Sequence, residues 1–126
     1  MSKKAKVSAE EMKRRLVEGK DLTSIQASEI VLRKARFDGL VLSETEFEKA
    51  DLSGSIFRNC LLDHIGFRKA NLRNCRFINC KGRHANYGRA DLSRSSFKDC
   101  SFFDSNYFGA LLRNYLKTRS KAHSHS

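Results

Sequence analysis

Residues 47–72 read FEKADLSGSIFRNCLLDHIGFRKANL, and every fifth position in this stretch holds a large apolar residue. The same spacing continues on both sides, from Leu32 to Leu112, and only Gly82 interrupts it. Two residues before each of these centres, most positions hold Ala, Ser, Thr or Cys. A helix face recurs about every 3.6 residues and a strand face about every 2, so this period requires a different coil. We interpret each unit as one side of a square coil, with the large residue on the axis and the small one at the corner.

Three segments share a stricter motif: Ala50-Asp51-Leu52-Ser53-Gly54, Ala70-Asn71-Leu72-Arg73-Asn74 and Ala90-Asp91-Leu92-Ser93-Arg94. They resemble the A(D/N)LXX consensus of the pentapeptide-repeat family, and the resemblance extends over about residues 22–112. It implies an all-β solenoid, a right-handed quadrilateral β-helix with four repeat units in each coil. Coils stacked at about 4.8 Å would number about 4.5. Gly82 and Ala27 are small centres, which predicts a local void or a shifted neighbour at each.

The two ends of the chain depart from the repeat. Ser8 and Glu11 have the spacing of a capping box, and Gly19 stands where a helix would end. We therefore predict a helix at about residues 9–18, with Met12, Leu16 and Val17 as its apolar stripe. The predicted organisation is a basic flexible tail at 1–7, a capping helix at 8–19, a β-helix at 20–112, and a cap with a basic flexible tail at 113–126.

Residues twenty apart are expected to stack in ladders along the coil axis. The predicted structural core comprises Phe37, Phe57, Phe77, Phe97, Leu52, Leu72, Leu92, Cys60, Cys80 and Cys100. The cysteines lack a paired Cys-x-x-Cys motif, so we interpret them as buried packing residues and expect no cofactor. A metal site is an alternative only for the outward column Glu44, His64, His84 and Asp104, which we interpret instead as a solvated polar column with no metal.

Charge favours an anionic partner, because 25 Lys and Arg residues against 14 Asp and Glu residues give a net charge of +11. More than half of this excess falls at the two ends of the sequence. On the body, two basic columns could bind an anion such as a phosphate backbone: Lys49, Lys69 and Arg89, and Arg33 and Arg73. A solubilising surface is the favoured interpretation, because acidic residues interrupt these columns and outward aromatic residues do not interleave with them.

Apolar residues near the C-terminal end predict a protein interface. Phe103 and Phe108 each follow a centre, where the surface is expected, and Leu111, Tyr115 and Leu116 lie close by in sequence. In some pentapeptide-repeat proteins the C-terminal end is a dimerisation surface, so the resemblance implies a homodimer through these five residues.

No catalytic constellation is visible: the sequence has no nucleophile with a base and an orienting group, and no glycine-rich phosphate loop. We therefore predict a non-enzymatic scaffold that mediates protein–protein interaction, with a partner that the sequence does not name. Nucleic-acid binding through the basic columns and tails is an alternative. A weaker one, implied by the resemblance, is DNA mimicry at DNA gyrase, which requires an acidic surface. An adaptor or effector role in a larger assembly, such as a bacterial secretion or phage-like apparatus, stays open.

Neither a secretory signal nor an apolar run of about 20 residues is visible, so no membrane span is predicted. The expected location is the cytoplasm, and a secreted effector is not excluded.

Overall fold

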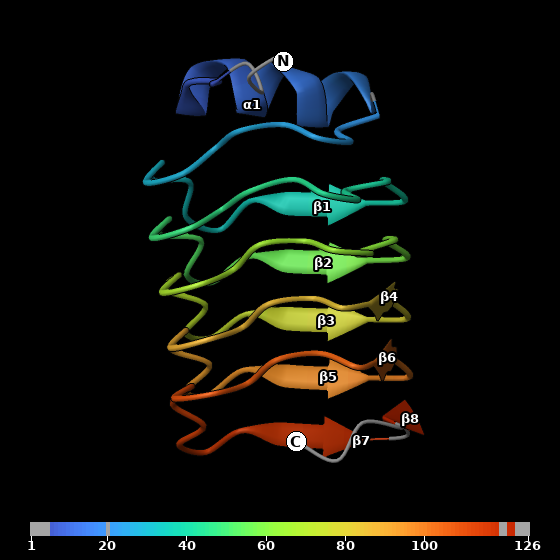
Figure 1. The fold of residues 1–126 in the computed structure, drawn as a ribbon. Coiled ribbons are helices and arrows are strands. Elements are labelled where there is room, and N and C mark those ends of the chain that lie inside the picture. The colour runs from blue at the N-terminus through green and yellow to red at the C-terminus, as the bar shows by residue number, and fades with distance from the viewer. Residues whose placement is uncertain (1–5, 20, 119–120, 123–126) are drawn as a thin grey trace.

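A computed structural model describes residues 6–19, 21–118 and 121–122. Figure 1 shows a single helix lying across one end of a stack of coils, with the N-terminus at the helix and the chain descending coil by coil. The helix is α1 (Ala9–Glu18), and the strands are β1 (Arg36–Asp38), β2 (Ile56–Arg58), β3 (Arg76–Ile78), β4 (Lys81–Arg83), β5 (Ser96–Lys98), β6 (Ser101–Phe103), β7 (Leu116–Thr118) and β8 (Lys121–Ala122). The described chain is a β-solenoid of about four turns, as predicted from the period.

The strands form two parallel sheets whose members come from successive coils. One sheet has the order β1-β2-β3-β5-β7 and the other the order β4-β6-β8. Phe37 pairs with Phe57, and Phe57 in turn pairs with Phe77, so the predicted offset of twenty residues is confirmed. Because the offset is constant, like side chains lie directly above one another through the stack.

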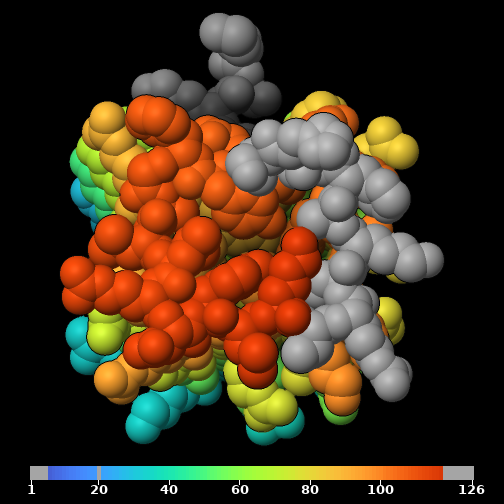
Figure 2. Space-filling model, turned by 90° about the horizontal axis from the view of Figure 1, so that it is seen from below, coloured from blue at the N-terminus to red at the C-terminus, as the bar shows by residue number. Residues whose placement is uncertain are grey.

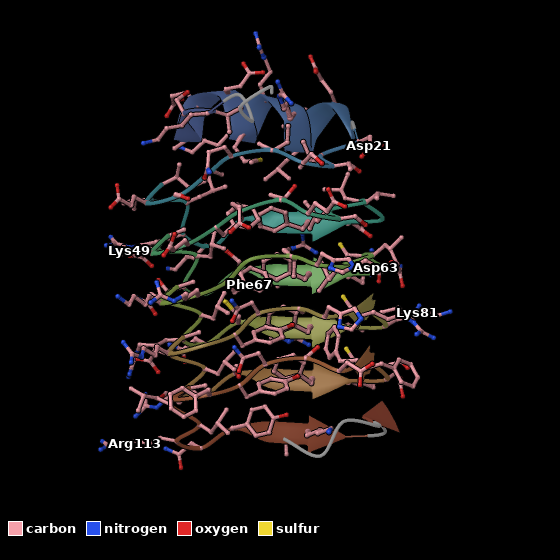
Figure 3. All side chains as sticks on the ribbon, in the orientation of Figure 1. Asp21, Lys49, Asp63, Phe67, Lys81 and Arg113 are labelled. Carbon is pink, nitrogen blue, oxygen red and sulfur yellow. The ribbon has the colours of Figure 1, made fainter. Side chains whose placement is uncertain are left out.

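Aromatic rings fill the axis of the solenoid. The rings of Phe37 and Phe57 stack at 4.4 Å between centroids, and those of Phe57 and Phe77 at 4.8 Å. A second ladder, Phe47, Phe67, Tyr87 and Tyr107, meets the first edge to face, as at 5.7 Å between Phe57 and Phe67. Figure 3 shows Phe67 lying within the stack. The predicted core residues are all buried, so the interior is packed with side chains.

The small residues at the corners contribute hydrogen bonds as well as fitting the available space. The Thr45 hydroxyl donates to the Leu22 carbonyl of the preceding coil and accepts from the Ile25 N–H at 3.3 Å. The Cys80 thiol donates in the same way to the Phe57 carbonyl, with Sγ 3.2 Å from the oxygen. Ser55, Cys60, Cys75 and Cys100 repeat this contact with a carbonyl 23 residues earlier. Interpreting these positions by size alone was therefore incomplete.

The outer corners require a left-handed backbone. The second residue after each centre has a positive φ, for example 60° at Lys49 and 56° at His64. Such a conformation is unfavourable for a residue with a side chain, and it persists where the surrounding hydrogen bonds fix it. Here the Lys49 N–H donates to the Arg68 carbonyl at 2.9 Å, and the Lys69 N–H donates to Gly88 at 2.9 Å. These corners direct a column of side chains away from the stack.

The N-terminal end is closed by α1. The Ser8 hydroxyl accepts from the Glu11 N–H at 3.1 Å, Gly19 ends the helix at a φ of 69°, and Met12 is buried, as predicted. Two details differ from the prediction. Val17 is 88% exposed, although it belongs to the predicted apolar stripe. Val7 is buried and donates to the Gln26 carbonyl at 2.9 Å, so residues 6–7 belong to the paired stack; residues 1–5 of the predicted tail lie outside the described residues.

Pairing continues beyond residue 112, where the β-helix was predicted to end. Strand β7 pairs with β5 and β8 pairs with β6, both with the offset of twenty residues. Part of the segment predicted as a cap and tail therefore adds to the solenoid, while residues 119–120 and 123–126 lie outside the described part.

The small centre Gly82 is accommodated by a close neighbour. A Cβ atom at this glycine would lie 2.9 Å from the Leu62 carbonyl oxygen and 3.0 Å from its carbon. Of the two predicted alternatives, a void or a shifted neighbour, these distances favour the second.

Candidate interaction surfaces

The C-terminal end of the solenoid exposes apolar side chains. Phe108 is 75% exposed, Leu111 52% and Leu116 58%. Leu112 belongs to the ladder of Leu32, Leu52, Leu72 and Leu92, which are all buried, yet it is 45% exposed itself. Figure 2 views the molecule from this end and shows the last coil lying across it. Among the described residues, the coil of Leu112 pairs only with the preceding coil, as at Asp91 and Leu111, which accounts for this exposure.

Two residues of the predicted interface are less accessible than the others. Phe103 is half-buried, and the Arg83 guanidinium carbon lies 5.5 Å from the centre of its ring. Tyr115 is also half-buried and packs against Phe97 at 5.5 Å between ring centroids. Phe108, Leu111, Leu112 and Leu116 are therefore the exposed apolar residues of this end, which we name the C-terminal patch. The sequence analysis did not single out Leu112, because the periodic pattern assigns it to the interior.

The predicted column of Lys49, Lys69 and Arg89 occupies one outer corner in three successive coils. All three are exposed and have positive φ. Figure 3 shows Lys49 directed away from the stack. None of them forms an ion pair with a residue in the described part of the chain. The column therefore presents three cations without an ion-pair partner, with Glu29 at the same corner in the coil before Lys49.

The other predicted basic column is neutralised by neighbouring carboxylates. Arg33 donates to Asp51 at 2.7 Å, and Arg73 donates to Asp91 at 3.1 Å. Burial raises the pKa of the Asp51 carboxyl, but hydrogen bonds from Ser53 and Arg33 outweigh it and the net shift is downward. In the coil between Arg33 and Arg73, the same position of the column is occupied by Ser53. The sequence analysis missed these pairs, although a basic residue eighteen positions before an acidic one is visible in the sequence.

Further ion pairs join adjacent coils at half-exposed positions. Arg58 contacts Asp38 at 2.7 Å, and Arg68 contacts Glu48 at 2.7 Å. The hydrogen bond from Arg58 lowers the pKa of the Asp38 carboxyl. Each pair is exposed enough for solvent to screen it, so its contribution to stability is small. Their main consequence is that much of the acidic surface is already paired with arginine.

The four cysteines are free, buried thiols. Burial raises the pKa of the Cys75 thiol to about 12. Hydrogen bonds with Cys100 and Cys60, together with burial, raise the pKa of Cys80 as well. These shifts favour the neutral thiols, consistent with the hydrogen bonds that they donate to backbone carbonyls.

The outward polar column of Glu44, His64, His84 and Asp104 brings two imidazoles together. The rings of His64 and His84 stack with centroids 5.1 Å apart and planes inclined by 30°. Within the described ranges no group of three His, Cys, Asp or Glu side chains is arranged to hold a metal ion.

A hollow of about 400 Å³ lies between α1 and the first coil. It is lined by Lys13, Leu16, Val17, Leu32, Arg33, Lys34, Ala35 and Arg36. We name it the N-terminal groove. The sequence analysis did not predict it, because it depends on how α1 lies across the coil and no residue pattern marks that arrangement.

Residues 30–107 match the family model described as the pentapeptide repeat region, which covers more than half of the chain. This chain therefore belongs to the pentapeptide-repeat family. No curated protein sequence matches it.

Among solved structures, the chain is similar to the pentapeptide repeat protein Rfr23 from the cyanobacterium Cyanothece 51142. The identity is 19%, the TM-score is 0.54, and the match covers 79% of this chain and 65% of Rfr23. It is also similar to a trypsin-treated form of QnrB1, described as a plasmid-mediated fluoroquinolone resistance protein. That match has 15% identity and a TM-score of 0.54, and covers 75% of this chain and 56% of QnrB1. This chain thus spans less than two thirds of either neighbour, and at these identities the likeness shows the fold alone.

Among the described residues, no helix has the length and apolar character that crossing a membrane requires.

Proposed function

We propose that this chain is a non-enzymatic scaffold that binds other proteins, and that its C-terminal patch pairs two copies of it. The observation that carries the proposal is that four of the exposed large apolar residues, Phe108, Leu111, Leu112 and Leu116, belong to the last coils at one end of the described chain. Exposed apolar patches mark protein interfaces. An interior packed with its own side chains supports a binding role rather than a catalytic one.

The position of the patch favours a second copy as its partner. Leu112 continues a ladder of buried leucines, and β7 is the last strand of its sheet. A strand at the end of a sheet presents unpaired backbone groups. When two such ends meet about a twofold axis, each offers the other the same apolar surface.

Sedimentation velocity at about 50 µM tests the pairing. We expect a dimer for the wild-type protein and a monomer for Phe108→Asp, because the substitution places a charge in the contact. Val41→Asp is the matched control, since Val41 is an exposed apolar residue far from this end, and it should leave the dimer intact. A monomeric wild type, or a Phe108→Asp protein that sediments as the wild type does, would refute the pairing.

Binding of a further protein is tested by affinity capture from the native host. A scaffold should retain the same protein with the wild-type chain and with Val41→Asp, at stoichiometric levels. Failure to capture any protein stoichiometrically would contradict this role, whatever the oligomeric state.

Polyanion binding is the second candidate function, supported by the unpaired column of Lys49, Lys69 and Arg89. Cations repeated at about 4.8 Å could neutralise neighbouring phosphates, and affinity would then fall steeply with salt. A mobility shift with duplex DNA at low and raised salt tests it, using the triple substitution of these residues by glutamine. An unchanged shift for the triple variant would assign the binding to other residues.

Mimicry of DNA at gyrase is the least supported role. It requires an acidic surface, whereas Asp38, Glu48, Asp51 and Asp91 are paired with arginines and the net charge is +11. We expect excess protein to leave gyrase supercoiling activity unchanged.

A further inference from the structure

The N-terminal groove combines an apolar floor with a basic rim. Leu16, Leu32 and Ala35 are buried or half-buried, and the side chains of Lys13, Arg33, Lys34 and Arg36 stand around them. No acidic side chain is among the described residues that line it. Its volume of about 400 Å³ lies within the range typical of ligand sites, about 300–1,000 Å³.

Two of the four cations in the groove form no ion pair within the described residues. Lys13 pairs with Glu10 at 3.3 Å, and Arg33 pairs with Asp51 at 2.7 Å. By contrast, Lys34 and Arg36 form no ion pair with any carboxylate in the described ranges. Arg36 is near enough to Asp38 to help lower the pKa of that carboxyl, but Asp38 is hydrogen-bonded to Arg58. The groove therefore complements a negatively charged occupant.

The backbone beside the groove has the donor pattern of an open sheet edge. In the lower coils the N–H at the position of Arg36 donates to the coil above: Ile56 to Ala35 at 2.9 Å, Arg76 to Ser55 at 3.0 Å and Ser96 to Cys75 at 3.0 Å. The corresponding acceptor for Arg36 would be Arg15. That residue lies in α1, where its carbonyl accepts from the Gly19 N–H at 3.0 Å.

The Val31 N–H likewise has its matching acceptor in α1 instead of in a coil above. The N–H groups of Asp51 and Asn71 below it each donate to the preceding coil at 2.8 Å. For Val31 the matching acceptor would be Glu10, which also lies in α1. By folding as a helix, residues 9–18 thus replace the segment of coil that would have paired with residues 31–36. Figure 1 shows α1 crossing above the first coil without a strand between them.

We propose that the N-terminal groove binds an acidic peptide segment, which adds to the edge formed by residues 31–36 and follows the corner of the coil at Lys34. The peptide backbone would accept hydrogen bonds from the Val31 and Arg36 N–H groups, as in other cases of strand addition. Its apolar side chains would contact Leu16, Leu32 and Ala35, and its carboxylates would face Lys34 and Arg36. Because this edge turns at Lys34, whose φ is 56°, the peptide backbone would bend there, as residues 51–56 do in the coil below.

The test uses an acetylated, amidated hexapeptide of alternating glutamate and valine, titrated into the ¹⁵N-labelled full chain. We expect amide shifts confined to residues 13–17 and 31–36, an affinity of about 10–100 µM, and at least about tenfold slower hydrogen exchange at Arg36. A peptide in which lysine replaces glutamate should not bind. The same glutamate peptide with alternate backbone N-methyl groups should bind at least about tenfold more weakly, because strand addition needs its backbone.

The variant Lys34→Glu, Arg36→Glu should lose at least about tenfold in affinity. Both substitutions suit the fold, because Glu44 and Glu46 occupy the equivalent positions in the repeat. The matched control is Arg76→Glu, Arg94→Glu, which makes the same change of charge in the same two columns but far from α1. Its affinity should stay within about twofold of the wild type.

Several results would overturn the proposal: no shift at about 1 mM peptide, shifts centred elsewhere, equal weakening by both double variants, or undiminished binding of the N-methylated peptide. The groove lies at the opposite end from the C-terminal patch, so Phe108→Asp should leave peptide affinity unchanged. Failure of one proposal is therefore distinguishable from failure of the other.

Discussion

Replacing Phe57 tests the ladder on which the fold depends. Phe57 is buried, and its ring stacks on Phe37 at 4.4 Å and on Phe77 at 4.8 Å, with Phe67 edge-on at 5.7 Å. Truncation of such a ring to alanine destabilises a protein by about 3–5 kcal/mol, and ring pairs of this geometry contribute about 0.5–1.5 kcal/mol each beyond burial. With three ring neighbours, we expect Phe57→Ala to fall in the upper half of that range.

Phe57→Leu separates the ring contacts from the burial of apolar surface. Leucine already forms the adjacent ladder, so it should keep most of the burial and lose only about 1–2 kcal/mol. Urea unfolding followed by circular dichroism measures both free energies, and Val41→Ala is the exposed control, expected within about 0.5 kcal/mol of the wild type. A loss below about 1 kcal/mol for Phe57→Ala would mean that this ring is not enclosed between its neighbours, and the stacking would then be wrong.

Three further predictions concern other parts of the repeat. Thr45→Val should destabilise the protein by about 1–3 kcal/mol in urea unfolding, because the buried Leu22 carbonyl loses its hydrogen-bond donor. Thr45→Ser keeps the hydroxyl and should not destabilise the protein. Equal losses for the two variants would contradict the hydrogen bond. Burial raises the pKa of Cys75 to about 12, so stability that is present below about pH 9 should be lost as the pH rises toward 12. The free energy of unfolding of Cys75→Ala should fall less between about pH 8 and 10.5 than that of the wild type. Parallel declines of the two free energies would contradict this prediction. Gly82→Ala should lower the free energy of unfolding by about 1–3 kcal/mol, because the new methyl meets the Leu62 backbone at 2.9 Å, and a neutral effect would show that the coil can relax there.

The interior could be predicted from the sequence because it depends on one repeated contact. Once Phe57 is placed over Phe37, the constant offset places every later ladder residue. The hydrogen bonds of the small corner residues were not predicted, since Ala, Ser, Thr and Cys have similar volumes and the pattern alone does not reveal a donor. Arg33 and Asp51 were likewise not matched, because an ion pair between coils is recognised only when side-chain reach is considered with stacking.

The ends were harder to predict, because the repeat gives no information about where stacking stops. Leu112 has the sequence position of an interior residue, yet it is exposed, because the described residues place a coil on one side of it only. At the other end, Val17 matches the apolar stripe of α1 but is 88% exposed beside the N-terminal groove. In both cases the sequence identifies the residue type correctly, and its surroundings depend on which elements are placed next to it.

This contrast bears on where recognition can reside in a solenoid. A partner that bound the sides of the rod would contact nearly the same backbone in every coil. Only the outward columns of side chains would distinguish one position from another. In the part of the chain that the structure describes, the two ends are unique. One carries exposed apolar residues, and the other carries edge N–H groups whose matching acceptors lie in α1. Substitutions at the ends should therefore change binding with little change in stability, whereas substitutions in the ladders should do the reverse. Variants of Phe108 and Lys34 compared with variants of Phe57, by binding and by unfolding, would show whether the two properties separate in this way.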